Sequence, residues 1–276
     1  MLEQEAPVES ATPDKPNLHE MTSPGVMFEH ITDPRTLLIP ETIAKYGLDE
    51  LIVQGYGVAE SSEAQEQLKI EYGEATDVIL ALDSAGKAIG SLALRRLKGE
   101  DGSPTIEFQR KVEGAFPKKA GRPVLHVNGI VVQQTYRSHG VGRNLMTQAI
   151  DLIRPSLIVG ETKTPEAVAI RMHLGESYFG YKPVGDAPQM NESVRDLVDA
   201  YVKLNEELLG TLWRDKAIDY DCTGVFYVSN KYLPTDVPRP RPELVGVFHD
   251  VCELQESENK RGSGKTAVAP IITIID

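Results

Sequence analysis

The sequence predicts an α/β fold with a mixed central sheet of about six to seven strands flanked by helices, and with an extra helical insertion. Three stretches carry this prediction. Residues 77–97 contain two apolar runs around a short Ser-Ala-Gly turn, which is typical of a β-hairpin. Residues 124–155 read as an apolar strand, a glycine-rich turn and an amphipathic helix. Residues 156–184 then continue as strand, helix and strand.

Composition limits the classes of function. The chain has 276 residues with 41 acidic and 29 basic side chains, a formal net charge of −12. Binding to nucleic-acid phosphates needs a basic surface, so this balance argues against nucleic acid and fits a cationic partner. No apolar run reaches the ~18 residues of a membrane span, and the acidic N-terminus does not resemble a signal peptide. With only Cys222 and Cys252, neither a disulfide framework nor a zinc site is expected. We therefore expect a cytoplasmic protein that binds no membrane and no metal.

The N-terminal half alternates a tail, a strand and helices. Residues 1–24 are rich in Pro, Ser, Glu and Thr and are predicted to be a flexible tail. A strand at 26–31 precedes residues 40–72, which are expected to be helical in pieces, with breaks at Gly47 and around 54–57. After the hairpin, residues 98–122 are expected to be a polar connection.

The stretch that follows has the composition of an anion-binding site. The strand 124–132, in which Gly129 predicts a bulge or a close backbone approach, leads into the turn RSHGVGR and directly into a helix that Pro155 ends. Glycines let successive backbone N–H groups converge, and a helix N-terminus adds partial positive charge, so phosphate is the expected ligand. The alternative is a glycine-rich turn that serves only close packing. The turn lacks the third glycine of the dinucleotide fingerprint.

The stretch from Ile130 to Met146, IVVQQTYRSHGVGRNLM, resembles motif A of the GNAT superfamily of N-acetyltransferases. That motif is a strand with an apolar end followed by Arg/Gln-x-x-Gly-x-Gly/Ala, and the order of elements over roughly residues 26–231 resembles the family as well. The resemblance implies transfer of an acetyl group from acetyl-CoA to a small-molecule or peptide amine, by direct attack in a ternary complex. The second hypothesis is a GNAT-fold module that binds acyl-CoA or is catalytically silent, and acts as a regulatory or structural interaction protein.

The resemblance also assigns the residues that bind the cofactor. In the family, the pyrophosphate lies on the backbone amides of the loop and the pantetheine arm lies along the preceding strand. The corresponding residues here are Ile130, Val131, Val132, Arg137, Ser138, His139, Gly140, Val141, Gly142 and Arg143, together with Thr164 at the start of the next predicted helix. The substitution Gly142→Asp is therefore expected to abolish CoA binding.

Two residues are the catalytic candidates. By the alternation of side chains along a strand, His126 and Asn128 are expected on the same face as Ile130. Some family members carry histidines at these two positions as proton relays, which implies His126 as the base with Asn128 holding a water. A half-buried, hydrogen-bonded histidine in the sheet is the open alternative.

The general acid is harder to place. The family often has a tyrosine on the helix after the fifth strand, but two registers of this segment put Arg171 or Glu176 at that position. Tyr178 is the nearest phenol and the candidate acid, and core packing of its ring is the alternative.

The resemblance divides the chain into three parts. We expect a GNAT-like domain over 25–232, with a helical insertion at about 186–218. The amphipathic helix at 193–215 within it either shapes the acceptor site or makes a homodimer contact. Residues 233–276 are predicted to be a Pro-rich linker and C-terminal extension, in which the apolar run 269–275 either adds an edge strand or binds a partner.

Overall fold

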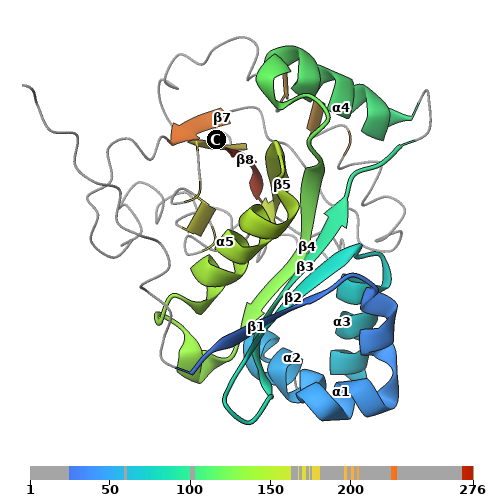
Figure 1. The fold of residues 1–276 in the computed structure, drawn as a ribbon, viewed down its shortest axis with the longest axis vertical. Helices are drawn as coiled ribbons and strands as arrows, with labels where there is room; N and C mark the ends of the chain where they lie inside the picture. Colours follow the sequence, from blue (N-terminus) through green and yellow to red (C-terminus); the bar gives the residue numbers. More distant parts are fainter. Residues whose placement is uncertain are drawn as a thin grey trace, which may run out of the picture.

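The fold is a single mixed sheet with helices on both faces (Figure 1). The computed structural model describes residues 25–58, 61–99, 103–162, 225–228 and 269–275, and also residues 167, 170, 171, 174, 176–180, 196, 197, 200, 201 and 204. The predicted α/β class is confirmed. The tail 1–24 lies outside the described residues.

Eight strands form the sheet, in the order β1-β2-β3-β4-β5-β8-β6-β7. Their bounds are Met27–Ile31 (β1), Asp77–Leu82 (β2), Ala88–Arg96 (β3), Val124–Val132 (β4), Leu157–Thr162 (β5), Glu176–Gly180 (β6), Val225–Val228 (β7) and Ala269–Ile274 (β8). Strands β4 and β5 pair in parallel, and the other neighbours are antiparallel. The strands lie close to the predicted ranges, and the sheet exceeds the expected number of strands because the C-terminal run joins it.

Three helices cover one face of the N-terminal part of the sheet and one helix covers the other (Figure 1). The first three are α1 (Pro40–Tyr46), α2 (Leu48–Tyr56) and α3 (Ser61–Gly73), and the opposite helix is α5 (Val141–Ile153). The predicted breaks are confirmed, because Gly47 and Gly57 end α1 and α2 with φ +68°. A side chain with a Cβ rarely adopts that conformation, so each glycine ends its helix where the chain must turn.

Strand β2 shows how both faces are filled. All six of its residues are buried, and they alternate between the two layers. Val78, Leu80 and Leu82 pack in the cluster with α1–α3, whereas Ile79 and Ala81 pack in the cluster with α5. A strand with helices on both faces carries apolar residues at consecutive positions, which explains the unbroken run VILAL.

The connection expected to be polar over 98–122 contains a helix, which corrects the prediction. Helix α4 spans Pro104–Ala115, and the Ser103 side chain at its N-cap accepts a hydrogen bond from the Ile106 N–H. Phe108 and Val112, four residues apart, are buried against the part of the sheet that contains β5 and β8. The capping serine, the proline at the first position and this apolar pair are the local signals for the helix. Short 3-10 turns occupy Pro34–Leu38 (η2), Pro117–Lys119 (η3) and Gln134–Tyr136 (η4).

The C-terminal strand β8 lies inside the sheet, which corrects the expectation of an edge strand or a partner-binding segment. It pairs with β5 through Leu157↔Ile274 and with β6 through Glu176↔Ile274. Ile271, Ile272 and Ile274 are all buried. An edge strand needs only one apolar face, so the consecutive isoleucines fit a strand that is covered on both faces. The final strand is therefore part of the domain and not of a separate extension after residue 232.

Beyond β5, the structure describes the chain only in part. Residues 167, 170, 171 and 174 are helical, as expected for the segment that starts near Thr164. The described residues within 193–215 are helical too, and Leu197, Tyr201 and Leu204 on the predicted apolar stripe are buried. The rest of the insertion at about 186–218 lies outside the described residues.

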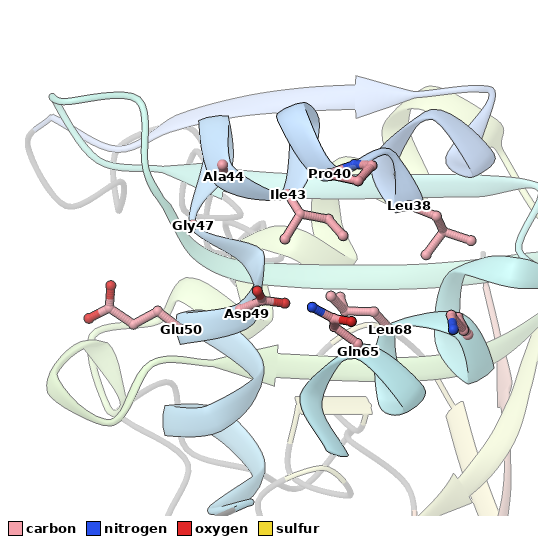
Figure 2. A pocket seen from close by; sticks show the side chains of 10 residues that line it. Leu38, Pro40, Ile43, Ala44, Gly47, Asp49, Glu50, Gln65 and Leu68 are labelled. Carbon is pink, nitrogen blue, oxygen red and sulfur yellow. The ribbon is translucent and has the colours of Figure 1, made fainter. Parts of the chain in front are cut away.

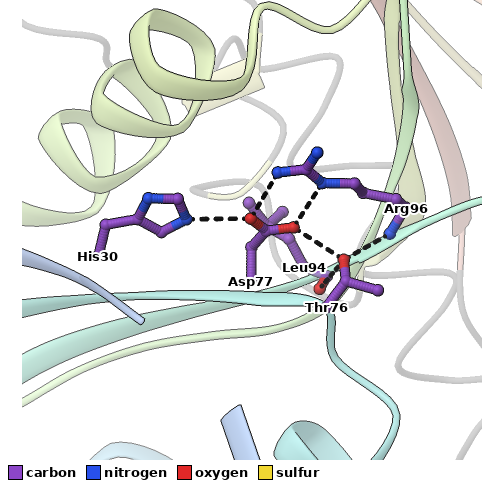
Figure 3. A network of polar contacts seen from close by, with 5 residues as sticks. All are labelled: His30, Thr76, Asp77, Leu94 and Arg96. Carbon is purple, nitrogen blue, oxygen red and sulfur yellow. Dashed lines mark hydrogen bonds and ion pairs between the residues drawn. The ribbon is translucent and has the colours of Figure 1, made fainter. Parts of the chain in front are cut away.

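A polar cluster joins the ends of β1, β2 and β3 (Figure 3). The buried Asp77 carboxylate accepts two hydrogen bonds of 2.8 Å from Arg96, from Nε and Nη2, and its Oδ1 lies 3.0 Å from His30 Nε2. Burial alone would raise the pKa of Asp77, but the hydrogen bonds from Arg96, Thr76 and His30 outweigh it and hold the pKa below its ordinary value. The cluster thus keeps a buried charge satisfied and ties three strands in register.

Candidate functional site

Strand β4 is paired along its length on one side only. With β3, the pairing runs from Leu125 to Val132, whereas with β5 it covers only Val124–His126. Beyond His126 the two parallel strands separate. The backbone of residues 127–132 therefore has hydrogen-bonding groups on that side that β5 does not satisfy. An extended molecule can add to such an edge in the way that another strand would.

A β-bulge lies at the point where the two strands separate. Ala93 pairs with Gly129 and Leu94 pairs with Val127, so Asn128 has no partner on β3. The bulge confirms the feature predicted at Gly129. It also reverses the side-chain alternation of β4, because one extra residue shifts every later position to the other face.

This reversal corrects the predicted faces of His126 and Asn128. Ile130 packs with the α5 cluster. The Asn128 amide instead donates from Nδ2 to the backbone oxygen of Glu71 in α3 at 3.2 Å, and His126 Nδ1 lies 3.0 Å from Asn128 Oδ1. Both side chains therefore lie on the α3 face, opposite to Ile130.

His126 is a buried side chain held in one orientation. Asn128 donates through its nitrogen, so its Oδ1 is the acceptor and His126 Nδ1 carries the hydrogen of their bond. The ring is 6% exposed. This arrangement agrees with the hydrogen-bonded histidine considered above.

Glu71 is a functional candidate that the sequence did not reveal. Its side chain is 1% exposed, and its carboxylate lies directly against Gly129: a Cβ at residue 129 would come within 2.5–2.8 Å of all three carboxyl atoms. Oε1 accepts a hydrogen bond from Gln67 Nε2 at 3.0 Å, and the Tyr56 hydroxyl also donates to the carboxylate. Oε2 is buried and has no hydrogen-bond partner among the residues that the structure describes.

Burial governs the ionisation of Glu71. Desolvation raises the pKa of Glu71 to about 7, although the hydrogen bonds from Tyr56 and Gln67 lower it in part. The carboxyl group therefore exchanges its proton near neutral pH. In the sequence, Glu71 is one of several acids on a largely polar helix, and only the approach of Gly129 on a distant strand distinguishes it.

The substitution Glu71→Gln is expected to stabilise the protein at pH 8 and to have little effect near pH 4. The folded-state pKa of about 7 lies above the ordinary 4.5, so the folded protein holds this proton more tightly and loses stability as the pH rises from 4.5 to 7. The difference corresponds to about 3 kcal/mol above pH 7. Urea unfolding of both proteins at pH 4, 6 and 8 measures it. Glu74→Gln, at an exposed position paired with Arg95, is the control, and a gain that does not change with pH would contradict the prediction.

The glycine-rich turn places an open helix N-terminus beside the end of β4. Ser138 and Gly140 have φ +65° and +77°, and Gly140 caps α5 without any side-chain hydrogen bond. The Asn144 N–H bonds to the Gly140 oxygen, so the N–H groups of residues 141–143 have no acceptor within the helix. Together with the helix dipole, these groups favour an anion.

The charged side chains of the turn are engaged in different ways. The Arg137 guanidinium donates to the backbone oxygens of Gly55 at 2.6 Å and Val132 at 3.2 Å, which joins the turn to the end of α2. His139 Nδ1 lies 2.8 Å from the Arg137 oxygen. Arg143 Nη2 lies 3.7 Å from the place where a Cβ of Gly140 would lie, so this guanidinium is close to the turn.

Gly142 is a packing position. A Cβ there would lie 3.1 Å from Ile170 Cδ1 and 3.7 Å from both Ile130 Cδ1 and Val132 Cγ2. An aspartate at 142 would therefore place its carboxylate among apolar side chains, and a loss of binding would not separate charge from damaged packing. Gly140, at the corner of the turn, is half-buried and has only Arg143 Nη2 near its Cβ position, at 3.7 Å, so it is the better position to test.

Of the remaining predicted residues, the structure describes the side chain of Arg171 but not those of Tyr178 and Thr164. Tyr178 belongs to β6, where its backbone pairs with Ile272, but its side chain lies outside the described residues, as does Thr164. Arg171, at one of the two registers considered for the acid, is buried, and its Nη2 would lie 3.0 Å from a Cβ at Gly160 of β5. The same Cβ position lies 3.3 Å from Val127 Cβ, so Arg171 reaches the region where β4 and β5 separate.

A separate pocket lies among the N-terminal helices (Figure 2). It has a volume of about 330 Å³ and is lined by Leu38, Pro40, Ile43, Ala44, Gly47, Asp49, Glu50, Gln65, Leu68 and Lys69. Asp49 and Glu50 come from the first turn of α2, whereas Gly55 and Tyr56, which adjoin the turn and Glu71, come from its last. The helix separates the two regions by roughly 10 Å, because each residue advances it by about 1.5 Å.

The described part of the chain contains neither a membrane-spanning helix nor a cluster of metal ligands. None of its helices is long and apolar enough to cross a membrane. Within the same residues, no group of three or more His, Cys, Asp or Glu side chains is arranged to hold a metal ion.

Comparison with known proteins adds the family. The model described as "Acetyltransferase (GNAT) family" matches residues 46–181, which include α2, α3, the bulged strand, the turn and α5. No curated protein sequence matches the chain.

Several solved structures are similar to this chain in part. An acetyltransferase from Corynebacterium glutamicum, described as related to histone acetyltransferase HPA2, is 17% identical to this chain. The match covers 60% of this chain and 92% of the acetyltransferase, with a TM-score of 0.38. A chain of the NatC complex bound to Gag peptide and CoA is 16% identical. The match covers 55% of this chain and 84% of the NatC chain, with a TM-score of 0.35. YhbS from Escherichia coli, in complex with CoA, is 19% identical to this chain. The match covers 50% of this chain and 64% of YhbS, with a TM-score of 0.31.

Proposed function

This chain belongs to the GNAT family of acetyltransferases, and from that premise we propose that it transfers an acetyl group from acetyl-CoA to a primary amine by direct attack in a ternary complex. The observation that carries the proposal is the open edge of β4 next to the uncapped N-terminus of α5. The two features together offer backbone groups to an extended arm and to a phosphate at its end.

The residues present fit acetyl-CoA. The turn 137–143 contains two arginines and no acidic side chain, so nothing in it repels a pyrophosphate. The N–H groups of residues 141–143 would hold the phosphate oxygens, and Ile130, Val131 and Val132 would supply backbone partners for the pantetheine arm. When bound, the thioester supplies an activated acetyl group, and a backbone N–H of β4 would polarise its carbonyl.

The reaction requires a base in the protein, because the acceptor amine is mostly protonated near neutral pH. A lysine-type amine has a pKa of about 10.4, so only about one molecule in a thousand is neutral near pH 7.4. A positioned base therefore increases the reactive fraction. His126 is one candidate on the α3 face, where Asn128 fixes its ring. Buried Arg171 would stabilise negative charge that develops near the end of β5.

Isothermal titration with acetyl-CoA, CoA and, as a control, ATP tests the cofactor assignment. The variant Gly140→Asp is expected to lower the affinity for acetyl-CoA at least tenfold, because its carboxylate would occupy the helix N-terminus that otherwise attracts phosphate. Gly140→Asn is the matched control, since Asn and Asp tolerate the left-handed conformation similarly and only Asp is charged.

Three outcomes are informative. The proposal is supported if the wild type binds acetyl-CoA with micromolar affinity and does not bind ATP, and if Gly140→Asp binds acetyl-CoA more weakly than Gly140→Asn does. If both variants bind acetyl-CoA with equal affinity, the turn is not part of the binding site. Binding without turnover on any amine of a panel would favour the alternative of a catalytically silent acyl-CoA-binding module.

A further inference from the structure

We propose that Glu71 is the catalytic base that takes the proton from the acceptor amine. This assignment rests on the proposed function, because it names the group that acts at the same site. It replaces His126 in that role, and it makes the pair His126–Asn128 the support that positions the end of α3.

The position of Glu71 is the first argument. Its carboxylate touches Gly129, the residue next to the bulge, at the point of β4 where the pairing with β5 has ended. No other residue type fits at 129 without moving this carboxylate, since a Cβ would meet its Cδ at 2.5 Å. A glycine on β4 and an acid on α3 thus bring a carboxyl group to the backbone that the thioester would follow.

The state of the carboxylate is the second argument. Within the described part of the chain, Oε2 is buried without a hydrogen-bond partner, although a buried carboxylate oxygen normally has one. Gln67 and Tyr56 hold the carboxyl group, so its orientation is set while one oxygen is left to accept a proton. The titratable groups that act on it are Tyr56 from α2 and Tyr72 from α3. His126 from β4 is linked only to the Glu71 backbone oxygen, through Asn128.

Tyr56 both contacts the Glu71 carboxylate and reaches the surface of the protein. Its hydroxyl donates to the carboxylate, and the residue is 41% exposed at the end of α2. The next residue, Gly57, is exposed and has nothing within 4 Å of its Cβ position. In this role, Glu71 requires the Tyr56 ring to move aside so that an acceptor nitrogen reaches Oε2.

The chemical step balances in protons. Glu71 Oε2 takes one proton from the acceptor ammonium, which gives the neutral amine. The amine nitrogen forms a bond to the thioester carbonyl carbon and the carbon–sulfur bond breaks. The second proton of the nitrogen goes to the leaving thiolate, so the products are the amide and CoA thiol, and Glu71 releases its proton to solvent.

The test compares Glu71→Gln with His126→Gln in the full chain, with an acceptor amine that the wild type acetylates. Glu71→Gln is expected to lower kcat/KM about 10²–10³-fold and to abolish the rise in rate around neutral pH, with acetyl-CoA affinity unchanged within threefold. His126→Gln is expected to keep that rise, with a loss below tenfold. Glu74→Gln, at the exposed position directly after α3, is the control.

The outcomes separate the two proposals. If the wild type binds acetyl-CoA and turns over, but Glu71→Gln keeps the same pH–rate profile within threefold, the assignment of Glu71 is wrong. Loss of the neutral-pH rise in His126→Gln alone would return the role to His126. A wild type that acetylates no amine would overturn the proposed function, and this role with it. Glu71→Asp, which keeps a carboxyl group, should retain the pH dependence at a lower rate.

Discussion

Removal of residues 269–276 is expected to leave the protein unable to fold. Strand β8 lies between β5 and β6, so its loss separates the sheet and exposes two unpaired strand edges. Each buried isoleucine contributes about 2–3 kcal/mol, so Ile271, Ile272 and Ile274 together contribute roughly 6–9 kcal/mol, which is comparable with the total stability of a typical domain, about 5–15 kcal/mol.

Soluble yield, circular dichroism and the unfolding transition of the truncated chain measure this effect. The control is Ile272→Val in the full chain, which removes one methylene group from the same strand and should cost about 1 kcal/mol. A truncated protein with the same Tm as the full chain would show that β8 does not hold the sheet together.

The variant Gly129→Ala is expected to destabilise the protein by about 2–3 kcal/mol and to abolish turnover. The added methyl group would meet the Glu71 carboxyl atoms at 2.5–2.8 Å, so the carboxylate or the bulge must move. If the clash with Glu71 causes the destabilisation, Gly129→Ala should lower the free energy of unfolding by at least 1 kcal/mol less in a Glu71→Ala background, because the clashing carboxyl atoms are gone.

A double-mutant cycle by urea unfolding checks this coupling. Gly114→Ala serves as the control, since Gly114 lies within α4 with nothing within 4 Å of its Cβ position. There an alanine should stabilise the protein by up to about 1 kcal/mol. Equal costs of Gly129→Ala in both backgrounds would mean that the bulge, and not Glu71, requires glycine at 129.

Several elements could be predicted because their signals are local. The hairpin β2–β3 follows from two apolar runs around a short turn, and α5 follows from a glycine-rich start, apolar residues at helical spacing and a proline beyond its end. The turn 137–143 was predicted for the same reason, since glycine and arginine residues in sequence are enough to indicate an anion site. Helix α4 had local signals as well, Ser103-Pro104 and the spacing of Phe108 and Val112, but the polar residues around them obscured it.

The faces of β4 show where a local rule fails. Strict alternation places His126 with Ile130, and it failed because one unpaired residue, Asn128, reverses the pattern. A bulge is decided by the register against β3, and that register depends on the packing of both strands rather than on the composition of one.

The sequence by itself determined the α/β class, the boundaries of most strands and helices, the glycine-rich turn and the resemblance to an acetyltransferase family. Each of these depends on residues close together in the chain. Only the tertiary structure decided that the C-terminal run lies inside the sheet, that His126 faces α3, and that Glu71 meets Gly129. Those features arise from contacts between segments that are 57 to more than 100 residues apart, and the periodicity of one segment carries no information about its partner.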